Sequence, residues 1–572
     1  MKILLCNIAI RKNPDPFPPV ACTSLIHALK ENGFDAHFYD IDAKRPSSDE
    51  LFNYFQKEQF DLVGISAVVS TGYLYTKQLS LLIKKTSPLT KVILGGNLAG
   101  AYEVILRKTS VDVCVIGEGE KVMANLARLS GKTADPRRFR EGLSGIKGIA
   151  FLDDNGSCRF TGHEELIPAG KIEEPDYELL EKSSVISQYI QDPLTRIDFS
   201  CDPRAHEPER SGKKMATIFT SKGCINSCTF CHRFVKGYRV IPLMKVIDTM
   251  KKLIDSYNVG FFCISDECFG EDSVWLEQFI EQVKPFDILF QIGGARVSLV
   301  KKNPDIMRRL KSAGLTAVYF GIESGSDKIL KLMRKNATKN ENLNAIRLCR
   351  EAGIYTVIQL VIGMPGENDS TIQETITFIN AAAEKFAHPQ FLAINYLQAL
   401  PGTACYEFIR SNGWLGSTID EEEQYLLKVS DVNASEYRQY CNVSEEDRAK
   451  VKLWKAKISA LTTISWLKAH GWKFPGRRQG RIRELKQLLK NSVLLYRMID
   501  LAGEWFWNGA LAVNRISVYG FGKALLIMLG LANGEDRKNY RFHLETLKER
   551  INVNLEGVNG SEDNKNRQYA HR

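Results

Sequence analysis

Short apolar runs alternate with amphipathic segments along roughly the first 130 residues of the chain. The runs have the length and composition of buried strands: KILLCNIA, DAHFYDID, FDLVGISAVV, TKVILGGN and DVCVIGEGE. Segments between them, such as CTSLIHALKENG, place apolar residues at helical spacing. Short apolar strands covered by helices predict a doubly wound, Rossmann-like α/β domain, here residues 1–135, which binds its ligand at the carboxyl ends of the strands.

A second alternation begins at residue 213 and continues to residue 440. Its strand candidates are MATIFTS, GFFCISDE, ILFQIGG, TAVYFGIES, TVIQLVIGMPGE and FLAINYLQ, and the first five precede helix-like segments. This pattern predicts a partial (β/α)6 TIM-type barrel. The chemistry of such a barrel belongs in the loops that follow the carboxyl ends of its strands.

Two further regions complete the chain. Residues 136–212 form a connector with a predicted hairpin that turns at Asp154, Asn155 and Gly156. Residues 441–554 are predicted to be mainly helical, and the polar residues 555–572 to be a disordered tail. Basic residues beside the aromatic run EWFW indicate peripheral contact with an anionic membrane surface. The favoured alternative is a helical cap over the substrate side of the barrel.

The composition limits the cellular compartment and the classes of binding partner that we expect. The 77 basic and 67 acidic residues leave a net charge of +10 on 572 residues, too small an excess to indicate nucleic acid. No uninterrupted apolar run reaches the roughly 18 residues of a membrane-spanning helix. Thirteen cysteines without regular pairing indicate a reducing compartment. We therefore expect a cytoplasmic protein, with association at a membrane surface left open.

Three of those cysteines lie close together in SKGCINSCTFCHR, as Cys224, Cys228 and Cys231. A structural zinc ion ordinarily takes four protein ligands, and a catalytic zinc ion prefers some nitrogen or oxygen among its three. Thiolates also hold 4Fe–4S clusters, where three cysteines would leave one iron open to a substrate or cofactor. Three unrelated buried cysteines are the alternative, which the spacing and the position after a strand disfavour.

These residues resemble a known family. TSKGCINSCTFC is similar to the signature of radical S-adenosylmethionine (SAM) enzymes, and FFCISDECFGED, VIQLVIGMPGEN and LQALPGTACYE resemble the motifs of their barrel. VGISAVVST, VILGGN and VIGEGE resemble the cobalamin-binding domain that precedes this barrel in the cobalamin-dependent branch. The resemblance covers residues 1–440. It implies a 4Fe–4S cluster that binds SAM and reductively cleaves it to a 5′-deoxyadenosyl radical, and a cobalamin that commonly donates a methyl group.

The resemblance also implies roles for individual residues. Cys224, Cys228 and Cys231 would be the catalytic cluster ligands. Contacts to SAM are expected from Phe230, Asp266, Arg296, Glu323, Gly363 and Glu367. Contacts to cobalamin are expected from Ser66, Gly95, Gly96, Gly117 and Glu118. The alternatives are rim salt bridges for the charged residues, a helix cap for Asp266 and simple turn positions for the glycines.

The sequence departs from the family at the position that supplies a ligand to the cobalt. The turn NPDPFPPV has no histidine where methionine-synthase-type domains supply the lower axial ligand, and His27 lies in the following helical stretch. No cobalt ligand can therefore be named, and a domain retained only as a scaffold stays an alternative.

The resemblance implies methylation of an unactivated carbon of a small-molecule or lipid-like substrate. A one-electron donor such as flavodoxin or ferredoxin would reduce the cluster, and no nucleic acid is expected as a partner. The first alternative keeps the cofactors but performs oxidative cyclisation or carbon–carbon bond formation. Weaker alternatives are a methylthiotransferase, for which Cys6, Cys22 and Cys114 lack a convincing arrangement, and a non-enzymatic cobalamin sensor.

Overall fold

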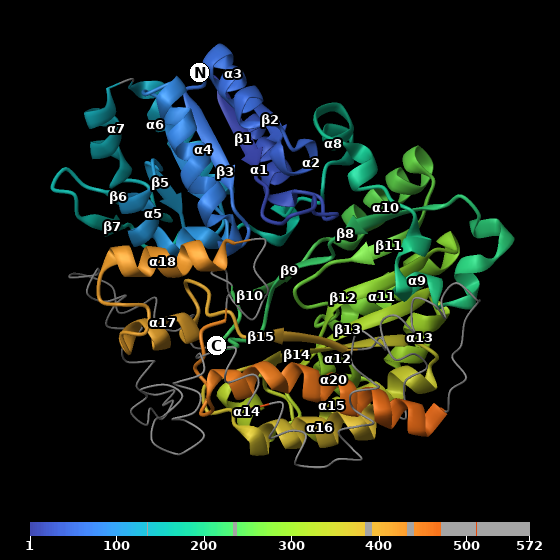
Figure 1. Cartoon of the computed structure of the whole chain (residues 1–572). Helices are drawn as coiled ribbons and strands as arrows, with labels where there is room; N and C mark the ends of the chain where they lie inside the picture. The colour runs from blue at the N-terminus through green and yellow to red at the C-terminus, as the bar shows by residue number, and fades with distance from the viewer. Residues whose placement is uncertain (134, 233–236, 384–391, 432–439, 471–510, 512–572) are drawn as a thin grey trace, which may run out of the picture.

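The computed structural model describes residues 1–470 except 134, 233–236, 384–391 and 432–439, and residue 511. Figure 1 shows two α/β units, an N-terminal one in blue and a second one in green to yellow. The sheets of the two units lie side by side, and helices near the end of the described chain cross between them.

The N-terminal unit is built on a seven-stranded sheet in the order β2-β1-β3-β4-β5-β6-β7. Its first five strands are parallel: β1 Ile3–Asn7, β2 Ala36–Asp40, β3 Leu62–Ser66, β4 Lys91–Gly95 and β5 Val113–Val115. The predicted hairpin forms as β6 Ile149–Leu152 and β7 Cys158–Phe160, and it extends this sheet in antiparallel fashion. The doubly wound domain is therefore confirmed, with the hairpin as its edge.

Helices cover both faces of this sheet. Helices α1 (Val20–Glu31) and α6 (Glu120–Lys132) pack together on one face, where Leu29 and Leu126 meet Ile3 and Leu5. Helices α3 (Ser48–Glu58), α4 (Tyr73–Thr86) and α5 (Tyr102–Lys108) cover the other face. Burial on both faces explains why the strand sequences are nearly continuous apolar runs.

The second sheet has six parallel strands in the order β15-β14-β13-β12-β11-β8, which confirms the partial barrel. The strands are β8 Lys214–Ile218, β11 Val259–Ile264, β12 Leu289–Ala295, β13 Leu315–Glu323, β14 Tyr355–Ile362 and β15 Leu392–Tyr396. Its outer helices include α10 (Leu243–Tyr257), α11 (Ser273–Val283), α15 (Lys339–Glu351) and α16 (Asp369–Ala383).

A segment of the connector closes the amino-terminal end of the barrel. The short helix α9 (Ile197–Ser200) contacts β12 and β13, and its Phe199 packs on Met215, Phe261 and Leu289. These three residues lie at or near the first positions of their strands. Helix α9 therefore covers the amino-terminal end of the barrel at β8, β11 and β12.

The first cysteine of the CxxxCxxC motif lies on a separate two-stranded hairpin. Strand β9 (Ser221–Cys224) pairs antiparallel with β10 (Gly237–Val240), whereas the sequence predicts only a loop after β8. Gly223 has φ +86, and a Cβ atom there would lie 2.0 Å from the carbonyl oxygen of Gly237. Only glycine fits this position, so the hairpin depends on it.

Helix α18 (Ile419–Val429), which follows α17 (Ala404–Ser411), joins the end of the barrel chain to the N-terminal unit (Figure 1). Its Glu423 accepts a 2.5 Å hydrogen bond from the hydroxyl of Tyr73 and forms an ion pair with Lys77. A second ion pair joins Asp420 to Lys108. Because these partners lie in the N-terminal unit, α18 holds the two sheets in one orientation.

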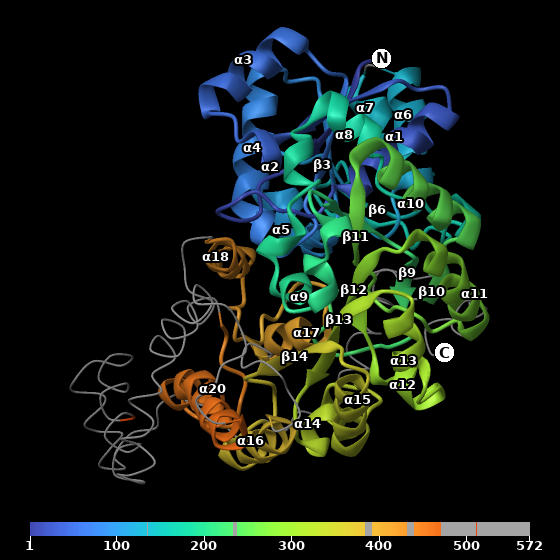
Figure 2. The same cartoon turned by 90° about the vertical axis from the view of Figure 1, so that its right-hand side faces the viewer.

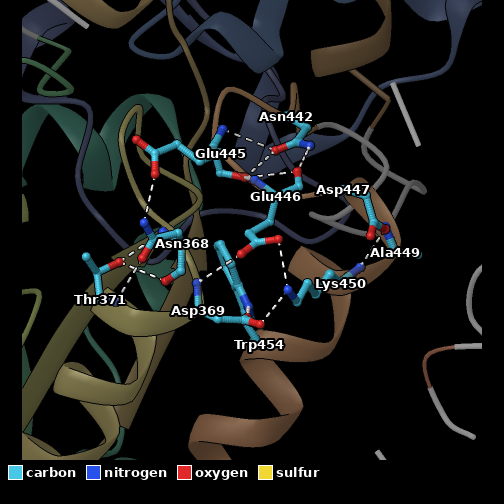
Figure 3. Close-up of polar contacts among 11 residues, drawn as sticks. Asn368, Asp369, Thr371, Asn442, Glu445, Glu446, Asp447, Ala449, Lys450 and Trp454 are labelled. Atoms are coloured by element: carbon cyan, nitrogen blue, oxygen red, sulfur yellow. Dashed lines mark hydrogen bonds and ion pairs between the residues drawn. The ribbon is translucent and has the colours of Figure 1, made fainter. Parts of the chain in front are cut away.

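The predicted helix at the start of the C-terminal region forms as α20 (Arg448–His470). It runs along α16 on the outside of the barrel, and the two helices lie side by side in both views (Figures 1 and 2). Trp454 is buried and donates a 2.8 Å hydrogen bond from its indole to Asp369, which also pairs with Lys450 (Figure 3).

The basic and aromatic stretches of residues 473–531 lie outside the described residues apart from residue 511, as does the tail. No helix in the described part is both long and apolar enough to cross a membrane.

Replacement of Trp454 tests how far α20 stabilises the barrel. We expect Trp454→Ala to lower the free energy of unfolding by about 3–5 kcal/mol, because it empties a buried site. Trp454→Phe should cost about 1 kcal/mol for the lost hydrogen bond to Asp369, plus a smaller packing loss. Denaturant unfolding followed by circular dichroism measures both, with Gln373→Ala on the exposed side of α16 as a neutral control. Equal stability of Trp454→Ala and the wild type would contradict the packing described here.

Candidate functional site

The two sheets direct the carboxyl ends of their strands at one shared cavity of about 780 Å³. The N-terminal unit contributes residues that end β1, β3, β4 and β5, together with the loop that follows β1. The barrel contributes residues from β9, β12, β13 and β14 and residues that follow β8 and β11. Ligands of open α/β sheets and of TIM-type barrels both bind at carboxyl ends, so this cavity is the candidate site.

The three motif cysteines lie beside the cavity in a loop that packs against residues 332–336. Cys224 is buried at the end of β9, while Cys228 and Cys231 are partly buried. The backbone amide of Asn226 approaches the Cys224 sulfur at 3.5 Å, and its side chain donates a 2.9 Å hydrogen bond to the carbonyl of Lys335. The loop is therefore anchored to the barrel at its centre.

A donor set of three thiols suits an iron–sulfur cluster, in which each thiolate binds a separate iron. Within the described residues, no three His, Cys, Asp or Glu side chains converge as ligands of a single ion. A fourth thiol, Cys268, is fully buried, and a hydrogen bond to Cys224 together with burial raises its pKa. Its position beside Cys224 comes from tertiary structure, and the spacing of the motif gives no sign of it.

Arg296 is a buried cation with incomplete pairing. It is 9% exposed, its Nη2 donates a 3.3 Å hydrogen bond to the carbonyl of Lys335, and its Nε and Nη1 have no partner among the described residues. Leaving charged N–H groups buried without acceptors is costly. The site therefore fits an anionic ligand group such as the carboxylate of SAM, and the rim salt-bridge alternative does not describe Arg296.

Glu323 does form a salt bridge, in a strained backbone conformation. Its carboxylate lies 2.9 Å from Nζ of Lys335, and its φ of +67 is in the left-handed region. A Cβ atom at the neighbouring Gly321 would lie 2.4 Å from the Glu323 carboxylate, so the close approach requires glycine there. Strained residues of this kind concentrate at functional sites. Lys335, which the sequence analysis did not select, completes the pair.

Asp266 lines the cavity and fixes the junction between β8 and β9. It accepts hydrogen bonds from the amide of Thr220 at 2.7 Å, the hydroxyl of Thr220 at 2.5 Å and the hydroxyl of Ser221 at 2.7 Å. The helix-cap alternative is wrong, because the following helix α11 is capped by Asp272, whose carboxylate accepts from the amide of Trp275. Asp266 is therefore a cavity residue whose carboxylate is held by the start of the cysteine hairpin.

Of the residues selected for SAM, only Asp266 is among those that line the cavity, whereas Arg296, Glu323, Phe230, Gly363 and Glu367 are not. Glu367 is buried and accepts hydrogen bonds from the amides of Gly363 at 2.5 Å and Met364 at 3.2 Å, while burial raises its pKa to about 7. Gly363 has φ +85, and a Cβ atom there would collide with the ring of Tyr440. Phe230 is partly buried against the main core. Glu367 thus shapes its own loop through the backbone.

All five residues selected for cobalamin line the cavity, namely Ser66, Gly95, Gly96, Gly117 and Glu118. A Cβ atom added at Gly95 or Gly117 would meet nothing within 4 Å, so a side chain there would project into open space. At Gly96, with φ +87, a Cβ would lie 2.4 Å from the carbonyl of Ala67. Gly95 and Gly117 therefore form a cradle that larger residues would fill, which fits a bulky ligand approaching the backbone, whereas Gly96 is required by its close contact with Ala67.

Glu118 instead connects the two units. Its carboxylate lies 2.6 Å from Nη2 of Arg239 and 3.1 Å from Nζ of Lys222, and it accepts a 2.7 Å hydrogen bond from the amide of Ile167. Lys222 and Arg239 lie on β9 and β10, so this one carboxylate ties the cavity loop of the N-terminal unit to the cysteine hairpin.

A second link joins the same two parts. The side chain of Asn97 donates a 2.9 Å hydrogen bond to the carbonyl of His232, and Nε2 of His232 lies 3.0 Å from the carbonyl of Asn97. Burial lowers the pKa of His232 to about 4, so its ring is neutral at physiological pH. His27 pairs with Asp176 at 2.9 Å, and no histidine is among the described residues that line the cavity.

Comparison with known proteins agrees with this division of the chain. The B12 binding domain family matches residues 7–127, and the Radical SAM superfamily matches residues 218–379. The anaerobic magnesium-protoporphyrin IX monomethyl ester cyclase of Cereibacter sphaeroides is 28% identical over 370 residues, which are 63% of this chain and 56% of the cyclase. The chain therefore matches little more than half of that relative's length.

Two solved structures share the fold. One is the radical SAM methyltransferase TsrM from Kitasatospora setae with cobalamin and a 4Fe–4S cluster bound, which is 20% identical with a TM-score of 0.54, covering 72% of this chain and 75% of TsrM. The other is the cobalamin-dependent SAM radical enzyme OxsB with aqua-cobalamin bound, which is 15% identical with a TM-score of 0.61. That match covers 100% of this chain and 83% of OxsB.

Single substitutions of the four clustered thiols test the ligand set. We expect Cys224→Ala, Cys228→Ala and Cys231→Ala each to lose most of the iron after anaerobic reconstitution, because each removes one cluster ligand. Cys268→Ala should retain wild-type iron and sulfide, since it removes only a neighbouring thiol. Iron and sulfide analysis with electron paramagnetic resonance measures this. Loss of the cluster from Cys268→Ala alone would show that the ligand set is wrong.

Proposed function

We propose that this chain, a cobalamin-dependent radical SAM enzyme, methylates an unactivated carbon of a small-molecule or lipid-like substrate. The observation that carries the proposal is the shared cavity, which is lined both by the glycines of the B12-binding domain and by the rim of the barrel. When bound, the cluster with SAM supplies a substrate radical and the cobalamin supplies a transferable methyl group. The protein's own part is to position these groups and to exclude water from them.

Specific residues take the roles that their surroundings favour. Cys224, Cys228 and Cys231 hold the cluster, and Arg296 offers its unpaired Nε and Nη1 to the SAM carboxylate. Asp266 holds the strand junction at the cavity wall and presents its remaining acceptor capacity to SAM. Gly95, Gly96 and Gly117 admit the corrin ring, as their exposure to the cavity supports. Glu118 maintains the junction between the two cofactor sites.

A second reaction class remains a candidate because of one observation. A curated relative at 28% identity is named as an anaerobic magnesium-protoporphyrin IX monomethyl ester cyclase, and this name supports the cyclisation alternative. Its match covers 56% of the cyclase's length, which leaves its substrate unassigned to this chain. Fold likeness to TsrM, a methyltransferase by its description, favours methylation.

The partners follow from the chemistry. Reductive cleavage of SAM needs one electron, so we propose a small redox protein such as flavodoxin or ferredoxin as the donor. Contact with an anionic membrane surface, in an otherwise cytoplasmic protein, rests on the basic and aromatic residues after 470. Pelleting of the full chain with anionic vesicles tests that contact. Pelleting that is absent, or that is equal with neutral and anionic vesicles, would exclude it.

Product analysis tests the reaction class. Reconstituted protein with cobalamin, SAM, a reductant and cell extract should form 5′-deoxyadenosine and S-adenosylhomocysteine together, because one SAM would be spent on each role. Mass spectrometry quantifies both, and Cys224→Ala should form neither. Deoxyadenosine without S-adenosylhomocysteine would favour the non-methylating alternative.

Substitution of Arg296 tests the SAM contact separately from turnover. We expect Arg296→Leu to weaken SAM binding to the cluster-loaded protein about tenfold to hundredfold, because charge-assisted hydrogen bonds are lost. Arg296→Lys should restore part of the affinity. Equilibrium dialysis with labelled SAM measures this, and Arg308→Leu, which removes an exposed arginine from the neighbouring helix, is the control. Equal affinities of Arg296→Leu and Arg308→Leu would remove Arg296 from the site.

A further inference from the structure

The barrel interior carries a layer of polar side chains below its carboxyl-terminal rim. Gln291 in β12, Tyr319 in β13 and Gln359 in β14 all line the shared cavity, and so does Arg196 from the connector just before α9. Branched aliphatic residues ordinarily fill this position in a TIM-type barrel. Buried polar groups need hydrogen-bond partners, so this layer calls for an explanation.

The charged side chains of this polar layer pair with one another. Nη2 of Arg196 lies 2.8 Å from Oδ2 of Asp198, and Nε lies 3.1 and 3.2 Å from the two carboxylate oxygens. The Tyr319 hydroxyl donates a 3.2 Å hydrogen bond to the same carboxylate, and burial raises the pKa of Tyr319, so the phenol stays neutral. The Asp198 side chain is 1% exposed. The layer therefore presents almost no net charge to the cavity.

The two glutamines retain unused hydrogen-bonding groups. Gln291 is 2% exposed, its side chain hydrogen-bonds the thiol of Cys263, and its Oε1 has no partner among the described residues. Gln359 is half-buried and makes no side-chain hydrogen bond to any residue that the structure describes. Together they offer a carbonyl acceptor and a complete carboxamide on strands that line the cavity.

We infer that this layer binds an uncharged amide-type group of the substrate, a carboxamide, lactam or peptide unit, which accepts and donates hydrogen bonds at once. The inference rests on the proposed function, because it names the substrate class for the same cavity. A carboxylate would be repelled by Oε1 of Gln291, and the guanidinium of Arg196 beside it is already neutralised by Asp198. An ammonium group would lie beside Arg196 without an unpaired carboxylate. Both charged alternatives would lose hydration without an adequate partner.

Binding of three matched probes tests the inference without turnover. Hexanamide, hexanoate and hexylammonium have the same chain length and differ only in the polar group. Each is titrated by saturation-transfer NMR into protein loaded with cluster and cobalamin, without SAM or reductant. We expect hexanamide to bind at least tenfold more tightly than the two ions. Gln291→Leu should weaken hexanamide about tenfold and leave the ions unchanged.

Two further variants keep the test decisive. Gln359→Leu should also weaken the binding of hexanamide. It replaces Gln291→Leu as the test variant if Gln291→Leu loses its cluster or its fold, which the iron content reports. Gln373→Leu, on the exposed side of α16, should bind as the wild type does. Absent hexanamide binding, tighter binding of an ion, or unchanged affinity in both cavity variants would overturn the inference. A failure of methyl transfer would not overturn the inference, because the binding measurement does not involve turnover.

Discussion

The structure depends on one geometric constraint, that two parallel sheets present their carboxyl ends to each other across a single cavity. Parallel strands direct all their following loops to one edge, so each sheet alone offers half of a site. Glu118 fixes the mutual position of the halves at the centre, where it pairs with Arg239 and Lys222 across the junction. Helix α18 fixes it at the periphery through Glu423.

The parts of this arrangement that depend on local pattern could be predicted from the sequence. The runs that became β1 to β5 and the six barrel strands are apolar at the spacing of buried parallel strands, so the two units were identified from periodicity alone. The β9–β10 hairpin was not predicted, because it consists of two short polar strands whose pairing leaves no periodic pattern. The closure by α9 likewise depends on Phe199 meeting residues of three distant strands.

The site could be predicted in part for the same reason. Residues that end or follow strands, such as Gly95 and Asp266, reach the cavity because position in the chain determines position at the rim. Glu367 has an equivalent position, yet its carboxylate turns back to its own loop amides. Gln291 did carry a signal, a polar residue inside the apolar run ILFQIGG, which is unusual for a strand at the centre of a barrel.

The reciprocal hydrogen bonds between Asn97 and His232 have a consequence for assembly. They join the loop after β4, which lines the cavity from the N-terminal unit, to the residue that follows Cys231. A ligand that orders either segment also lowers the conformational entropy that the other must lose on binding. By thermodynamic linkage, two ligands that each order one of these segments would raise each other's affinity by the same factor. Molecules that hold only one of the two ligands would then be rarer than they would be if the two segments were independent.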